Sequence, residues 1–194
     1  MTPARVSSRP YLLTLIVWLV AALALGASGR LQELRPPVPQ LVLVGLAAAV
    51  ILGAVVGGNF RSWLFGLGYR QLVAFHLLRF VGAYFLVLYA RGELPFAFAV
   101  PGGWGDIAVA VWALVLVLLV PRLEARTGVV AAWNAAGLLD ILFTVATASR
   151  LAYANPDSMS PLLRLPLSLL PTFLVPLIIA THVIVFWRLW VERF

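Results

Sequence analysis

Ionisable side chains stand out in this chain because long apolar runs surround them. His76 and Arg79 lie within one such run, Asp140 lies within another, and Asp106 opens a third. An arginine among carboxylates can pair with them, bind an anion or assist acid–base chemistry. These residue types therefore mark a polar site inside an otherwise apolar protein.

The composition indicates a protein that lives in lipid. Of 194 residues, 63% are hydrophobic and only 11% are charged, whereas a soluble domain carries about 25% charged residues. With so little polar surface, the bilayer must be the main solvent and partner. The net charge of +7 is carried by scattered arginines, which indicates membrane topology and excludes a nucleic-acid partner. The absence of cysteine excludes disulfides, thiolate metal sites and iron–sulfur clusters.

The apolar runs predict an all-α integral membrane protein. A membrane-spanning helix needs about 20 apolar residues, and the chain has room for a bundle of six. We expect residues 1–194 to form a single polytopic domain. Its helices are predicted at about 11–28, 41–58, 71–90, 104–120, 128–148 and 165–190.

Prolines and glycines predict two irregular places in the bundle. The run at 107–120 would rise only about 21 Å, short of the ~30 Å hydrocarbon core. We therefore expect the Pro/Gly-rich residues 95–106 to be broken or re-entrant before the fourth helix. Prolines also recur every five residues from Pro161 to Pro176, which predicts a kink near Thr172.

Small residues recur every four positions in the second run and form a ridge that lets another helix approach closely. Our interpretation is an internal packing seam, and the alternative is a homodimer contact. The residues of this ridge are Gly45, Ala49, Gly53 and Gly57.

The fifth run carries a stripe with Asp140 at its centre and Asn134 beside it. The stripe residues are Trp133, Gly137, Asp140, Thr144 and Thr147. At a rise of about 1.5 Å per residue, His76, Asn134 and His182 lie roughly 9 Å inside the membrane. At that depth His76 is close enough to the interface to be half-solvated. An Arg or Asp at mid-bilayer costs about 2.5–3.5 kcal/mol, so Arg79 and the two aspartates are expected to share one cavity.

Three functions fit these residues. The leading hypothesis is a protein that binds or transports a small solute or protons, and its site residues are Arg79, Asp106, Asn134, Asp140, His182 and His76. The alternative is an intramembrane enzyme for a lipid or quinone-like substrate, with Asp106 and Asp140 as acid and base. No metal or cofactor is predicted, although two histidines at one depth also admit a bis-histidine b-type haem. A structural membrane subunit, in which Arg79 only fixes helix order, is the remaining interpretation.

The arginines also predict an orientation. In a six-helix arrangement, eight arginines lie on the side of the two termini and five on the other side, with Arg79 set aside. The positive-inside rule then places both termini in the cytoplasm. The use of arginine without lysine is typical of a GC-rich bacterial genome, so we expect a bacterial inner membrane.

Overall fold

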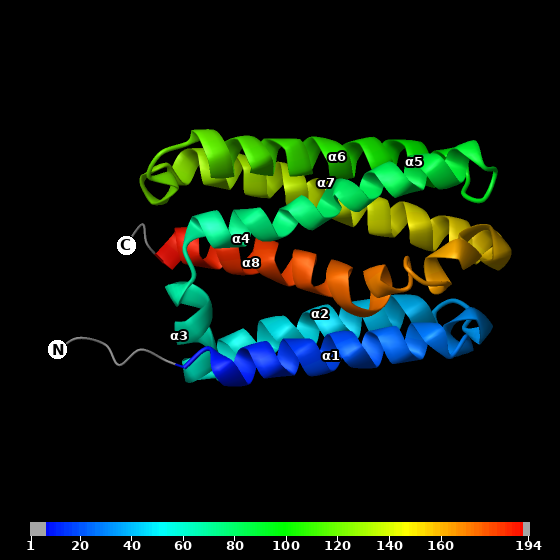
Figure 1. The fold of residues 1–194 in the computed structure, drawn as a ribbon, viewed down its shortest axis with the longest axis horizontal. Coiled ribbons are helices and arrows are strands. Elements are labelled where there is room, and N and C mark those ends of the chain that lie inside the picture. Colours follow the sequence, from blue (N-terminus) through cyan, green and yellow to red (C-terminus); the bar gives the residue numbers. More distant parts are fainter. Residues whose placement is uncertain (1–6, 192–194) are drawn as a thin grey trace.

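The computed structural model describes residues 7–191, which are helical in most of their length and contain no strand (Figure 1). Apolar segments favour helices in lipid because a helix satisfies its backbone hydrogen bonds internally. The α-helices are α1 Arg9–Ala27, α2 Val38–Val56, α3 Gly58–Gly66, α4 Tyr69–Phe75, α5 Gly82–Ala90, α6 Phe96–Leu119, α7 Thr127–Ala154 and α8 Val175–Val191.

Within residues 7–191, six helical stretches are long and apolar enough to cross a membrane, which confirms the six-helix prediction. Four of them are α1, α2, α6 and α7. The third crossing joins α4 to α5 through the 3-10 segment His76–Val81, and the sixth joins the π-helical turn Leu170–Leu174 to α8. The described chain begins and ends at the same end of the bundle, where α3 lies crosswise (Figure 1).

The crossings differ in how deeply they are buried. The helix α6 packs against α5 and α7, and α8 packs against both α7 and α2. The helix α1 is peripheral, because only 11% of its apolar window is buried. It is attached to the sixth crossing by Trp18, whose indole donates a hydrogen bond to the Thr172 carbonyl at 2.8 Å.

The prediction of a broken or re-entrant segment before the fourth helix was wrong. The helix α6 begins at Phe96, directly after Pro95, and continues through Pro101 to Leu119. At about 1.5 Å per residue its 24 residues are long enough for the hydrocarbon core. Lipid favours this outcome, since a continuous helix leaves far fewer backbone groups without a hydrogen-bond partner than an open loop.

The glycines of this segment serve close packing instead of a break. A Cβ atom at Gly82 would lie 2.5 Å from the Gly103 carbonyl oxygen and 2.7 Å from the Asp106 Cβ. A Cβ atom at Gly103 would lie 2.8 Å from the Gly82 carbonyl oxygen. The backbones of the third crossing and α6 therefore touch at these two glycines.

Other boundaries moved by smaller amounts. The helix α7 continues to Ala154, past the predicted end at 148, because the first stop signal is Asn155-Pro156. The irregularity predicted near Thr172 is present as the π-helical turn Leu170–Leu174. Residues 165–168 precede that turn and are not regular helix.

The small-residue ridge on α2 packs inside the protein only at its C-terminal half, where Gly53 and Gly57 approach Phe60 of α3, so the interpretation as an internal seam was wrong for its first half. Gly45 and Ala49 are exposed, and a Cβ atom at Gly45 would meet no atom within 4 Å. The buried residues of α2 lie on another face and are Leu43, Ala47 and Ala54. This buried face packs against the rest of the bundle, which leaves Gly45 and Ala49 free for lipid or a second copy.

Candidate functional site

Arg79 is the centre of an ionic cluster inside the bundle. Its side chain is fully buried. The guanidinium donates from Nε to Asp106 Oδ1 at 2.6 Å, from Nη1 to the Gly137 carbonyl oxygen at 2.9 Å, and from Nη2 to Asp140 Oδ2. These bonds join the third crossing, α6 and α7, as expected from the energetic argument for a shared cavity.

The two carboxylates of the cluster differ in their surroundings. The side chain of Asp106 is 5% exposed, whereas that of Asp140 is 18% exposed. Asp140 packs against Gly105, where a Cβ atom would collide with its carboxylate. Glycine at 105 is therefore required for α7 to bring Asp140 to the same arginine.

A second cluster surrounds the two histidines, both fully buried. Asn134 donates from Nδ2 to the His182 carbonyl oxygen at 2.9 Å, and its Oδ1 lies 2.8 Å from His182 Nδ1. His76 Nε2 lies 3.1 Å from the Thr181 hydroxyl. The expected common depth of His76, Asn134 and His182 is thus realised, but the expected half-solvation of His76 was wrong because α8 and Trp133 cover its ring.

The hydrogen bonds orient both rings and place one proton of His182. Asn134 Oδ1 can only accept, so His182 carries its proton on Nδ1. The Thr181 hydroxyl lies 2.9 Å from the Leu177 carbonyl oxygen as well as 3.1 Å from His76 Nε2, so this contact fixes the ring of His76 without assigning its tautomer. The remaining nitrogens, His76 Nδ1 and His182 Nε2, are buried without a partner in the described residues.

The rings of His76 and His182 are in direct contact, with centroids 4.2 Å apart. A porphyrin plane cannot lie between rings at this separation. The bis-histidine haem alternative therefore does not fit this arrangement. The rings instead pack against Trp133, whose centroid is 4.8 Å from that of His76.

Gly137 separates the two clusters. Its carbonyl oxygen accepts from Arg79, and a Cβ atom at this position would lie 2.6 Å from His182 Cε1. The absence of a side chain allows the imidazole and the guanidinium to approach α7 at the same turn. The polar interior is therefore continuous from Asp106 to His76.

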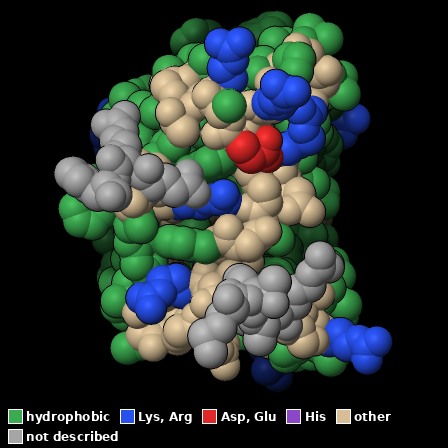
Figure 2. Space-filling view, turned by 90° about the vertical axis from the view of Figure 1, so that its left-hand side faces the viewer, with side chains coloured by type: hydrophobic (Ala, Val, Ile, Leu, Met, Phe, Trp, Pro, Cys, Tyr) green, Lys and Arg blue, Asp and Glu red, His purple; other side chains and the backbone are tan. Residues whose placement is uncertain are grey.

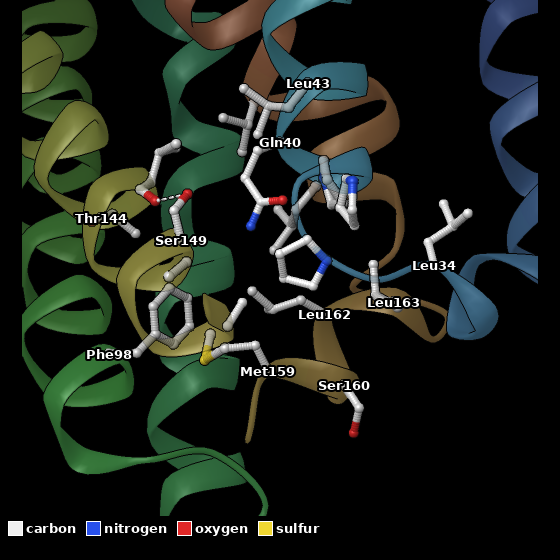
Figure 3. Close-up of a pocket in the computed structure, with 18 of the residues that line it drawn as sticks. Leu34, Gln40, Leu43, Phe98, Thr144, Ser149, Met159, Ser160, Leu162 and Leu163 are labelled. Carbon is white, nitrogen blue, oxygen red and sulfur yellow. Dashed lines mark hydrogen bonds between the residues drawn. The ribbon is translucent and has the colours of Figure 1, made fainter. Parts of the chain in front are cut away.

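A cavity of about 200 Å³ opens beside the ionic cluster (Figure 3). Arg79 and Asp106 line it, whereas Asp140 does not. The three charged groups pair as expected, but the expectation that all three share one cavity was wrong for Asp140. Most of the wall is apolar and comes from α2, α5, α6, α7 and the sixth crossing; it includes Leu43, Phe85, Phe98, Ile141, Val175 and Ile178. Figure 3 shows Gln40 facing Ser149 across the space, with Phe98 and Met159 nearby.

Two polar atoms on the cavity wall lack a partner. Gln40 Oε1 and Thr144 Oγ1 are buried and form no hydrogen bond within the described residues. A buried acceptor without a partner costs about 1–3 kcal/mol. Thr144 belongs to the stripe seen in the sequence, but Gln40 follows a proline-rich loop and carried no signal that could have revealed it.

The cavity opens at the end of the bundle opposite the described termini. Residues of the loop before α2 and of the 3-10 segment Pro156–Leu163 surround this mouth. Arg35 and Asp157 lie there and form an exposed ion pair with Nη1 and Oδ1 2.8 Å apart. Because these two charges compensate each other at the mouth, Arg79 and Asp106 are the charged groups that line the inner part of the cavity.

Comparison with known families gives a match over most of the chain. The family described as Domain of unknown function (DUF8737) matches residues 36–190. This range includes both polar clusters and most of the cavity wall, but not α1. Comparisons with curated proteins and with solved structures gave no match.

Proposed function

The chain belongs to the family described as Domain of unknown function (DUF8737), and we propose that it is a multi-pass membrane protein that binds a small, largely apolar molecule. The observation that carries the proposal is the apolar cavity with Arg79 and Asp106 at its inner end. Binding sites for small molecules are typically apolar hollows with a few polar groups that orient the ligand.

The buried ions support a functional role for this cavity. Replacement of a buried ion pair by apolar residues is often neutral or stabilising, so stability alone does not explain an ionic cluster. Charged residues inside a membrane commonly mark a path or a site for a solute. Arg79 and Asp106 combine both features, because they are buried and yet line the open space.

Binding and transport require different states of the bundle. On the side of the termini, the fully buried residues His76, Trp133 and His182 pack together and close the interior. Transport of a solute or of protons would require this layer to open while the mouth near Arg35 closes. We therefore propose binding as the function of the described state. Transport would be shown in addition if the protein also carried the solute across the membrane of vesicles.

The enzyme alternative has less support from the geometry. A pair of catalytic carboxylates must both reach the substrate, but only Asp106 lines the cavity. Arg79 also donates to both carboxylates and holds them on separate nitrogens, so they do not face each other as a pair that shares a proton.

The proposed binding site can be tested by filling the cavity with a larger side chain. We expect the purified protein in phosphatidylcholine nanodiscs to bind 1-naphthylmethanol beyond the partitioning into empty discs, measured by equilibrium dialysis. Ala148 lines the cavity, so Ala148→Phe should weaken this binding at least about tenfold. Ala146 is exposed on the same helix, and Ala146→Phe should bind as the unchanged protein does. Equal binding by both variants would refute a site in this cavity.

A further inference from the structure

We propose that the ligand of this cavity is a protonated amine, with one ammonium group at Asp106 and an apolar body along the wall. This inference rests on the proposed binding function and specifies its ligand class. Charge balance, unpartnered hydrogen-bonding atoms and the apolar lining each support it independently.

The ionic cluster holds one arginine and two aspartates, so with both carboxylates ionised it carries one excess negative charge. The other described ionisable groups nearby do not balance it. His76 and His182 are buried against each other, and a charged imidazole there would leave its second N–H without an acceptor. Arg35 is paired with Asp157 at the mouth. An isolated charge in a low-dielectric interior is unfavourable unless an opposite charge compensates it. A ligand cation at Asp106 supplies that charge.

The unpartnered polar atoms point to a ligand that donates hydrogen bonds. An ammonium group has three donors and no acceptor. Thr144 Oγ1 is a buried atom without a partner, and Thr144 packs on Gly102, one helical turn from Asp106 on α6. Gln40 Oε1 lies farther along the same wall, toward the mouth. Asp106 and Thr144 can thus accept from one ammonium group.

The lining excludes the two competing ligand classes. A carboxylic acid would add a third negative charge beside Asp106 and Asp140, while Arg79 already donates to both. A strongly hydrated inorganic cation would hold its water shell against the apolar side chains of Phe85, Phe98 and Ile141, which cannot form hydrogen bonds with that water. An amine on an apolar body places its charge at Asp106 and its apolar atoms against this wall.

The test uses four ligands with one apolar body, and the unchanged protein in phosphatidylcholine nanodiscs. They are 1-naphthylmethylamine, its N,N,N-trimethyl derivative, 1-naphthylmethanol and 1-naphthoic acid. We expect the amine to bind about tenfold more tightly than the alcohol, the trimethyl compound to lie between them, and the acid to bind most weakly. Empty discs correct for the partitioning of each ligand.

Two variants assign the preference to the cluster. Asp106→Asn should lower the affinity for the amine to that for the alcohol, whereas Glu93→Gln, in an exposed loop, should change neither affinity. Thr144→Val should weaken binding of the amine, which keeps the test valid should Asp106→Asn fail to fold. Equal affinities for amine and alcohol, or tightest binding of the acid, would overturn the amine while leaving the binding function intact. Binding of none of the four ligands would overturn both.

Discussion

At the scale of residues, Arg79 and its two carboxylates could be found in the sequence because each is exceptional in an apolar chain. Their pairing followed from the energy that each would cost alone. The cavity partners could not be found in this way. Gln40 and Thr144 are ordinary residue types, and only the arrangement of the helices leaves their polar atoms without partners.

The energetic dependence of the cluster can be measured in a double-mutant cycle. Arg79→Leu leaves two carboxylates without their cation, and removing one partner of a buried pair costs about 3–5 kcal/mol. Asp106→Leu should also be strongly destabilising. The double variant should lose about 0.5–3 kcal/mol less than the sum of the single losses, because only Asp140 then remains and its side chain is 18% exposed.

The measurement is SDS-induced unfolding in micelles, followed by the fluorescence of the 7 tryptophans. Additive losses would show that Arg79 and Asp106 stabilise the fold independently. Such a result would contradict the ion pair as the reason for their burial.

At the scale of elements, the number and order of the crossings could be predicted because apolar length specifies them. The start of α6 could not, since Pro101, Gly102 and Gly103 are signals both for a break and for close helix packing. Tertiary contact decides between the two: Gly103 meets Gly82, and the helix continues. The same ambiguity affected the ridge on α2, where equal spacing of small residues accompanies an exposed face.

Matched alanine substitutions separate packed from exposed glycines. Gly82→Ala places a Cβ atom 2.5 Å from the Gly103 carbonyl oxygen, so the third crossing and α6 must move apart. We expect a loss of about 1–3 kcal/mol in the same unfolding assay. Gly45→Ala meets no atom within 4 Å and should leave stability unchanged or slightly raised.

The exposed ridge also supports a proposal about assembly. We propose that Gly45 and Ala49 allow a second copy of the chain to approach closely, as small residues do between membrane helices. In a variant that carries a single cysteine, Leu52→Cys at an exposed position seven residues from Gly45, Gly45→Leu should then abolish disulfide cross-linking between copies in membranes while the monomer stays folded. Unchanged cross-linking would place the contact elsewhere, and a folding defect would contradict the exposure of this face.

At the scale of the whole molecule, charge is distributed unequally between the two ends. The end that holds the described termini carries Arg9, Arg61, Arg70, Arg122, Arg126 and Arg188 with Glu124, and Figure 2 shows basic side chains around this face. The opposite end carries Arg30, Arg35, Arg91, Arg150 and Arg164, together with Glu33, Glu93 and Asp157. The arginines Arg5 and Arg193 of the sequence count lie outside the described residues.

Two of these arginines also contact neighbouring helices through their side chains. Arg70 donates to the Val120 carbonyl oxygen at 2.9 Å, at the end of α6, and Arg61 lies over the Trp187 ring at 5.8 Å from its centroid. Cations near a helix C-terminus interact favourably with its dipole. Even so, of the four described acidic residues that lie at the two ends, three are at the opposite end, so the difference in net charge between the ends exceeds the difference in arginines.

This asymmetry yields our prediction for orientation. The positive-inside rule places the arginine-rich end, and hence the cavity-closing histidine layer, on the cytoplasmic side of a bacterial inner membrane. The cavity mouth then faces the other side.

Since the chain contains no cysteine, single cysteine substitutions at exposed positions report the side of the membrane on which they lie, without background labelling. In spheroplasts, a membrane-impermeant maleimide should label Glu93→Cys at once and Glu124→Cys only after lysis. The reversed pattern would show the opposite orientation. Labelling of both cysteines from one side would mean that α6, the crossing between these two positions, does not span the membrane.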